Sequence, residues 1–359
     1  MESLSGSTAQ ARRWLDSWAF GRKHALRGAA ACRIATGLSV LGLLLSNLSS
    51  RDLWVGQASI WAEPARVISR FPELALLKGV SGDILTLVYV VTMLAALAFV
   101  GGWHTKAANV ITFVGFIAIV GQNPVVGAQS DNLVRLTLLW MLMMRTAEHW
   151  SLDCRRRAHT TEDDRESRAR EDDVLPVWLS TGLHNIGLFS LATQAILTYM
   201  AGGLDKISQS EWRHGTALYY TMQLPEYRPF PGLSDLLSQN RVVLASLTYA
   251  VLLVQLFFGP LLLNPVTRRL VLALAVAVSV FFAVVFALPW SSLATIAVTS
   301  LFVADTTWQR IETGVLRGAR PAGDWIVDRG YAIADKVDDA RYRFVLPVID
   351  RVRETFSRR

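Results

Sequence analysis

The sequence predicts an all-α membrane protein, a polytopic bundle of about eight transmembrane helices with both termini in the cytoplasm. Of its 359 residues, 52% are hydrophobic and only 18% are charged. Several long runs carry almost no charge, and an apolar helix needs about 20 residues to cross a hydrocarbon core roughly 30 Å thick. Basic residues flank these runs, which favours membrane helices over an unusually large soluble core.

The first 147 residues contain four predicted spans. A basic tail over residues 1–28 lacks the short apolar core and cleavage site of a signal peptide, so the first span, residues 29–48, is itself the insertion signal. The loop over 49–81 is mildly amphipathic and is expected to lie along the outer interface. The next three spans are predicted at 82–101, about 107–122 and about 131–147.

A charged loop over 148–175 separates the fourth span from the fifth, which is the longest, at about 176–204. The loop is low in apolar residues, so we expect a solvated, partly disordered segment. The sixth and seventh spans are predicted at 242–263 and 270–288. We interpret residues 291–305 as an eighth span, with a re-entrant segment as the alternative.

The distribution of Lys and Arg supports this topology, because it places roughly three times as many basic residues on the cytoplasmic side as on the outer side. The net charge of +7 is therefore explained by topology and by membrane lipid, and no nucleic acid partner is expected. No spacing of Cys, His or carboxylates predicts a metal site. A transmembrane domain over 29–305 thus follows the tail over 1–28 and precedes a cytoplasmic amphipathic tail over 306–359.

The main candidate for chemistry is Lys206, just beyond the last apolar position of the fifth span. At the mouth of a cavity between helices, partial desolvation would lower the pKa of this lysine and let the neutral amine act as a base. The alternative, favoured by position alone, is a lysine that snorkels to the membrane surface. The candidates for substrate binding nearby are Asp205, Glu211, Trp212, His214, Tyr219 and Tyr220. The aromatic residues among them could face a flat ligand such as a quinone, or form an interfacial belt.

Ionisable groups inside the spans are further candidates, because they are costly in lipid. Asp131 and Arg135 are four residues apart at the outer end of the fourth span and could pair on one helix face. They either line an outward cavity near Lys206 and contribute to substrate binding, or lock the bundle. Arg33 is expected to snorkel at the inner end of the first span, and His184 to make a structural hydrogen bond between helices.

Two blocks of the sequence resemble the horizontally transferred transmembrane (HTTM) domain. The first runs from GWHTK to EHWSLD, residues 102–153, and the second is AGGLDKISQSEWRHGTALYYTMQLPEYR, residues 201–228. The similarity extends over about residues 25–305. This domain forms the membrane part of vitamin K-dependent gamma-carboxylase and occurs in bacterial proteins, including maturation factors of the sporulation-delaying toxin system. The resemblance implies a protein of the bacterial plasma membrane.

In this resemblance Lys206 matches the carboxylase base, which implies deprotonation of a reduced quinone of the menaquinol or vitamin K type and its oxidation by dioxygen. The sequence departs from the carboxylase where Ser130 and Asp131 stand in place of a histidine, and it lacks the large outward substrate domain. Two functions stay open. One is modification or maturation of an exported peptide by such chemistry, and the other is a non-enzymatic export, immunity or maturation partner of a secreted peptide. A small-solute transporter is disfavoured because no inverted repeat is found.

Overall fold

The computed structural model describes residues 10, 16–55, 57–67, 73, 75–159 and 175–315. The chain divides into two compact units, Met1–Asp305 and Thr306–Arg359, and all elements named below belong to the first. The predicted amphipathic helix of the tail lies outside the described residues beyond residue 315. Most of the predicted charged loop, residues 160–174, lies outside them as well.

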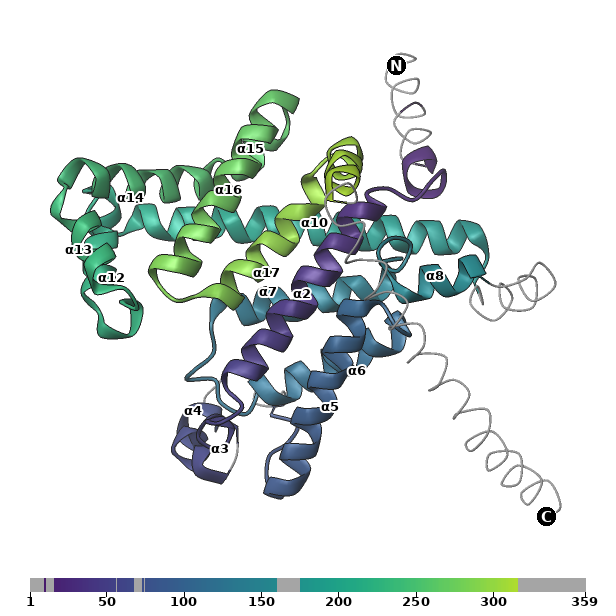
Figure 1. Cartoon of the computed structure of the whole chain (residues 1–359), viewed down its shortest axis with the longest axis horizontal. Coiled ribbons are helices and arrows are strands. Elements are labelled where there is room, and N and C mark those ends of the chain that lie inside the picture. The colour runs from purple at the N-terminus through teal and green to yellow at the C-terminus, as the bar shows by residue number, and fades with distance from the viewer. Residues whose placement is uncertain are drawn as a thin grey trace, which may run out of the picture. The chain divides into compact units, whose positions relative to one another are not determined.

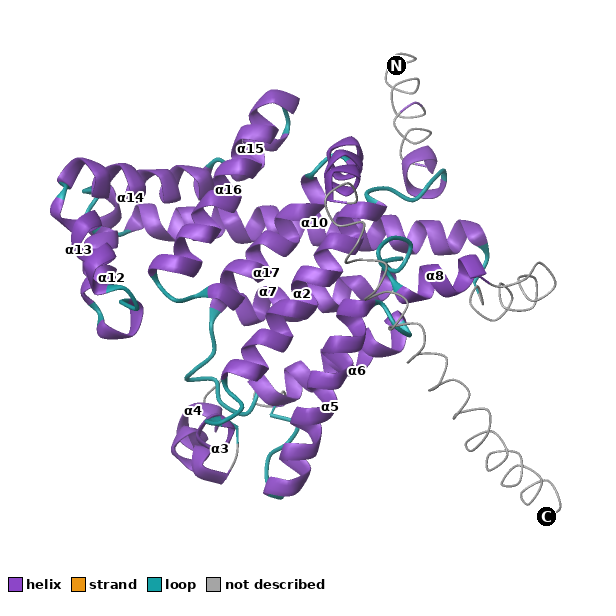
Figure 2. Ribbon diagram, in the orientation of Figure 1, coloured by secondary structure: helices purple, strands orange, loops and turns teal. Residues whose placement is uncertain are grey.

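Every regular element among the described residues is a helix, which confirms the predicted all-α class (Figures 1 and 2). The helices that fall in the eight predicted spans are α2 (Leu26–Ser46), α5 (Gly82–Gly101), α6 (Thr105–Val120), α7 (Gln129–Met143), α10 (Val177–Ser208), α14 (Arg241–Leu256), α16 (Pro265–Val285) and α17 (Pro289–Thr299). The shorter helices are α3 (Arg51–Trp54), η1 (Gln57–Ala62), α4 (Glu63–Val67), α8 (Leu152–His159), α11 (Ser210–Arg213), α12 (Ala217–Gln223), η3 (Pro225–Tyr227), α13 (Pro231–Gln239), α15 (Phe258–Leu262) and η4 (Ser300–Phe302).

Among the described residues, four helices, α2, α5, α10 and α16, are long and apolar enough to cross a membrane. The number rises to five if α13 and α14, which are bent by 99° at their junction, form one span. α17 has 11 residues, a length of about 16 Å at 1.5 Å per residue, so it favours the re-entrant alternative for residues 291–305. The total of eight spans and the orientation of the termini stay predictions.

The longest helix, α10, has 32 residues and therefore extends for about 48 Å. Because the hydrocarbon core is roughly 30 Å thick, a helix of this length must tilt or project into the head groups. Figure 1 shows α10 running across α2, α16 and α17 rather than alongside them. The C-terminal end of α10, which carries Lys206, is joined through α11 and α12 to α13.

The core forms around α2, which packs between α17 and α5. Gly42 leaves room for the indole of Trp290, since a Cβ at this glycine would lie 2.2 Å from the ring. Trp290 is also held by hydrogen bonds at both ends. Its carbonyl accepts from the Ser39 hydroxyl at 2.7 Å, and its Nε1 donates to the Ser46 hydroxyl at 2.8 Å. The start of α17 is therefore fixed to the second half of α2.

The segment that precedes α2 is fastened to α10 by two buried polar side chains. The Asn185 amide donates to three backbone carbonyls within residues 18–22 and accepts from the backbone N–H of His24. His184 Nε2 lies 2.8 Å from the His24 carbonyl, and its Nδ1 accepts from the Arg145 N–H at 3.0 Å. The structural role predicted for His184 is confirmed, although its partners are backbone groups.

Arg33 lies between the two ends of the segment 102–153, the first of the two blocks that resemble the HTTM domain. Its side chain is fully buried and its Nη2 donates to the Trp150 carbonyl at 2.6 Å, so the prediction that it snorkels is wrong. Gly102 leaves the room it needs, because a Cβ there would lie 1.9 Å from Nη1. Beside it, the Asp153 carboxylate accepts from two backbone N–H groups and from the Thr105 hydroxyl at the start of α6.

The outward faces of α5 and α16 are apolar and exposed. On α5 the exposed residues recur every three or four positions, at Ile84, Leu87, Val91, Leu94 and Leu97, and therefore share one face. On α16 a similar set is Val266, Leu270, Leu274, Val280 and Val284. Contiguous apolar faces of this kind are rare on soluble monomers and fit a lipid environment.

Candidate functional site

The Lys206 side chain lies in the last turn of α10 and is half-buried. The chain turns back after Ser208 into α11, which brings the indole of Trp212 against the lysine. Nζ lies 5.3 Å from the centroid of this ring, within the range of a cation–π contact. Its one hydrogen bond, to the Gly202 carbonyl in the preceding turn, is long, at 3.5 Å. The amine is thus shielded on one side by an aromatic ring and, among the described residues, forms no direct ion pair, although the neighbouring Asp205 carboxylate interacts with it electrostatically.

Two glycines before Lys206 let α10 and α14 approach closely. Gly203 is buried, and a Cβ there would lie 2.7 Å from the backbone nitrogen of Leu256. At Gly202 a Cβ would lie 3.2 Å from Gln255 Oε1 and 3.9 Å from Lys206 Nζ, so these two atoms are at most about 7 Å apart. The sequence AGGLDK therefore brings a residue of α14 next to the lysine.

Gln255 is the residue of this site that the sequence did not reveal. Its Oε1 is buried and accepts no hydrogen bond within the described part of the chain. A buried amide oxygen without a donor costs free energy, commonly about 1–3 kcal/mol. The sequence shows one Gln inside the apolar run VLLVQLFF, which indicates a polar side chain within a span. It does not indicate which residue of another helix lies next to this side chain.

The other polar candidates near Lys206 face outward. Asp205, Glu211 and His214 are exposed. The Asp205 carboxylate accepts from Gln209 Nε2 at 3.2 Å, and the Ser210 hydroxyl donates to Glu211 at 2.6 Å, which lowers the pKa of Glu211. These residues surround the approach to Lys206 without contacting its amine.

Tyr219 and Tyr220 lie on the outer side of α12, with 41% and 58% of their surfaces exposed. Their rings meet edge to face at 5.7 Å. The neighbouring Leu218 and Met222 point inward and are buried. This exposure fits the interfacial aromatic belt better than the wall of a ligand site.

Asp131 and Arg135 belong to a second region, at the N-terminus of α7. Their side chains form no direct ion pair, because Asp131 accepts from the Ala128 N–H at 2.7 Å and Arg135 donates to the Asn132 side chain at 2.6 Å. Next to Asp131, the hydroxyls of Ser130 and Ser291 are 2.9 Å apart and connect α7 to α17. These contacts support the alternative in which this region locks the bundle.

The two regions nevertheless lie toward the same end of the bundle, because α7 and α10 are antiparallel. Trp140 Nε1 donates to Gln194 Oε1 at 2.8 Å, while Met143, further along α7, lies next to Gly187, which comes earlier in α10. The N-terminal end of α7 and the C-terminal end of α10 therefore lie toward the same end of the bundle.

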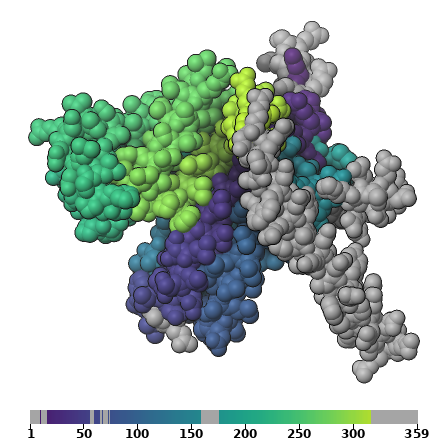
Figure 3. Space-filling view, in the orientation of Figure 1, coloured from purple at the N-terminus to yellow at the C-terminus, as the bar shows by residue number. Residues whose placement is uncertain are grey.

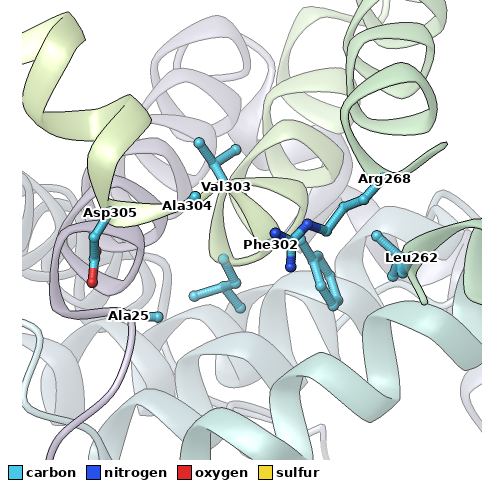
Figure 4. A pocket seen from close by; sticks show the side chains of 8 residues that line it. Ala25, Leu262, Arg268, Phe302, Val303, Ala304 and Asp305 are labelled. Carbon is cyan, nitrogen blue, oxygen red and sulfur yellow. The ribbon is translucent and has the colours of Figure 1, made fainter. Parts of the chain in front are cut away.

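Two cavities lie elsewhere. A cavity of about 330 Å³ is bordered by the starts of α2 and α16 (Figure 4), and a much smaller one adjoins Asp131 and Trp290. Neither is lined by Lys206. Within the described residues, no group of three or more His, Cys, Asp or Glu side chains is placed to hold a metal ion.

A family model described as the HTTM domain matches residues 24–308. This match covers most of the chain and includes α2 to α17 with both regions described above. Comparison with curated proteins and with solved structures finds no significant match.

Proposed function

Because this chain belongs to the HTTM domain family, we propose that it modifies or matures an exported peptide at the bacterial plasma membrane, with Lys206 as the base toward a reduced quinone. The family and the long apolar helices make it a membrane protein related to the vitamin K-dependent carboxylase. The observation that carries the proposal is the surroundings of the Lys206 amine, which lies 5.3 Å from the centroid of the Trp212 ring and within about 7 Å of the unpartnered Gln255 oxygen.

The proposed role requires a neutral amine that becomes an ammonium. Lys206 Nζ takes a proton from a hydroquinone hydroxyl, and partial burial together with the Trp212 ring limits access of water during this transfer. The ammonium is then stabilised by the face of Trp212 and by Gln255 Oε1, which gains the donor it lacks. The reduced quinone, of the menaquinol or vitamin K type, would be oxidised by dioxygen, and this oxidation would supply the strong base that the resemblance implies.

The test is quinol-dependent oxygen uptake and epoxide formation by the purified protein in lipid. Lys206→Ala should lower turnover by a factor of about 10² to 10⁴, the usual contribution of a general base. Lys78→Ala is the matched control, because Lys78 is an exposed lysine that pairs with Glu63 at 2.7 Å. Full activity of the Lys206→Ala variant would show that Lys206 is not the base. A folded wild type without turnover would favour the alternative below.

The alternative is a non-enzymatic export, immunity or maturation partner of a secreted peptide. It is favoured by exposed apolar side chains at the start of α13 and within it, in the segment that belongs to the green surface in Figure 3. Phe230 and Leu236 have 55% and 67% of their surfaces exposed. In this case Leu236→Ser should abolish co-purification of the peptide, whereas Lys206→Ala should leave it intact. The reverse result would support the enzyme.

A further inference from the structure

The cavity of about 330 Å³ lies at the ends of two helices that are long enough to cross a membrane. Ala25, next to the first residue of α2, lines one side, and Arg268, in the first turn of α16, lines the other. The ends of such helices lie at the level of lipid head groups. The cavity is therefore placed where a head group would enter.

The wall of this cavity is mixed, with apolar side chains and two charged residues on opposite sides. Its apolar side chains include Leu262, Leu301 and Phe302. In Figure 4 the Arg268 guanidinium extends into the cavity beside the Phe302 ring, and the Asp305 carboxylate lies across from it, near Ala25. The cavity thus has a cationic end and an anionic end with hydrocarbon between them.

Within the described part of the chain, the Arg268 guanidinium and the Asp305 carboxylate form no ion pair or side-chain hydrogen bond, and Asp305 is exposed, so both groups are available to a ligand. Arg268 is half-buried next to the Phe302 ring and borders the cavity, where its guanidinium is accessible to an anionic ligand. Guanidinium groups bind phosphate through two parallel hydrogen bonds. An anionic phosphate is the ligand that suits Arg268, and a primary ammonium suits Asp305.

We propose that this cavity binds the head group of a phospholipid that carries a primary amine, with the phosphate at Arg268 and the ammonium at Asp305. The first acyl carbons then follow Leu262, Leu301 and Phe302 into the membrane. The volume is near the lower end of the range for ligand sites, which fits a head group rather than a whole lipid. This site is separate from Lys206 and does not depend on the proposed quinol chemistry.

The test is native mass spectrometry of the full chain, delipidated in detergent and titrated with phosphatidylethanolamine, phosphatidylcholine or phosphatidylglycerol. The wild type should prefer phosphatidylethanolamine. Arg268→Gln should weaken binding of all three lipids about tenfold, the effect expected for a lost charge-assisted hydrogen bond. Asp305→Asn should abolish the preference and retain binding of the phosphate.

Arg269→Gln is the matched control, because Arg269 is the exposed neighbour of Arg268, makes the same charge change and does not line the cavity. Thermal melting of each variant checks that it is folded, and Arg268→Lys should show a smaller loss than Arg268→Gln. Equal lipid retention by Arg268→Gln and Arg269→Gln would overturn the proposal. Competition by soluble glycerophosphoethanolamine at the same concentration as the lipid would also overturn it, in favour of a water-soluble ligand.

Discussion

Replacing Gly203 with Ala tests the close crossing of α10 and α14 that places Gln255 near Lys206. The new Cβ would lie 2.7 Å from the nitrogen and 2.8 Å from the Cα of Leu256. Both are backbone atoms that cannot rotate away, so the helices must separate by about 0.7 Å to reach an ordinary contact of 3.4 Å. Overpacking of this kind costs about 1–3 kcal/mol.

The adjacent glycine provides the control for this substitution. A Cβ at Gly202 would meet only side-chain ends within 4 Å, with the nearest atom, Gln255 Oε1, at 3.2 Å. Gly to Ala inside a helix adds up to about 1 kcal/mol of helix propensity, so Gly202→Ala should be neutral or stabilising. Gly203→Ala should therefore melt below Gly202→Ala in the same detergent, by roughly 2–8 °C.

The assay also separates packing from chemistry. If Gly203→Ala moves Gln255 away from Lys206, quinol turnover should fall in a variant that keeps both side chains. Equal melting temperatures for Gly203→Ala and Gly202→Ala would refute the reasoning, because the helices would then not be in backbone contact at this point.

Three further predictions follow from the contacts described above. Asn185→Ala removes the hydrogen bonds that hold residues 18–22 and should increase amide hydrogen exchange there. The free energy of unfolding should fall by about 2–4 kcal/mol, because several buried hydrogen bonds are lost. Unchanged exchange would contradict the anchoring role. Asp153→Ala removes the cap of α6 and should cost about 1–2 kcal/mol, measured by thermal melting against Asp153→Asn, which keeps an acceptor oxygen. Ser208→Cys should react with an impermeant maleimide in intact cells if the end of α10 faces outward; labelling only after lysis would reverse the topology.

The positions of the helices were predictable from sequence because each apolar run is long and bounded by charge, glycine or proline. α5 was predicted at its observed bounds, and α10 only gains four residues at its C-terminal end. The number of spans was harder to predict, since hydropathy does not show where a helix breaks. Phe257 interrupts the predicted sixth span, and α17 ends at Thr299.

The contacts of the candidate site could be predicted only where they are local in sequence. Trp212 returns to Lys206 because one short turn separates them, so proximity along the chain was informative. Gln255 is 49 positions from Lys206, and only the packing of α10 on α14 brings them together. Asp131 and Arg135 have the spacing of an ion pair on a helix. Each instead forms a hydrogen bond with a group nearer in the sequence, Asp131 with a backbone N–H and Arg135 with a side-chain amide.

The length of α10 has a consequence for how the lipid environment acts on the protein. A helix of about 48 Å cannot match a hydrocarbon core of roughly 30 Å, so its tilt depends on bilayer thickness. Because Lys206 lies in the last turn, a change of tilt shifts this residue more than any residue near the centre of the helix. The length of the lipid acyl chains therefore determines how deeply the Lys206 amine lies in the membrane. In membranes of different thickness, the same amine would be exposed to water to different extents.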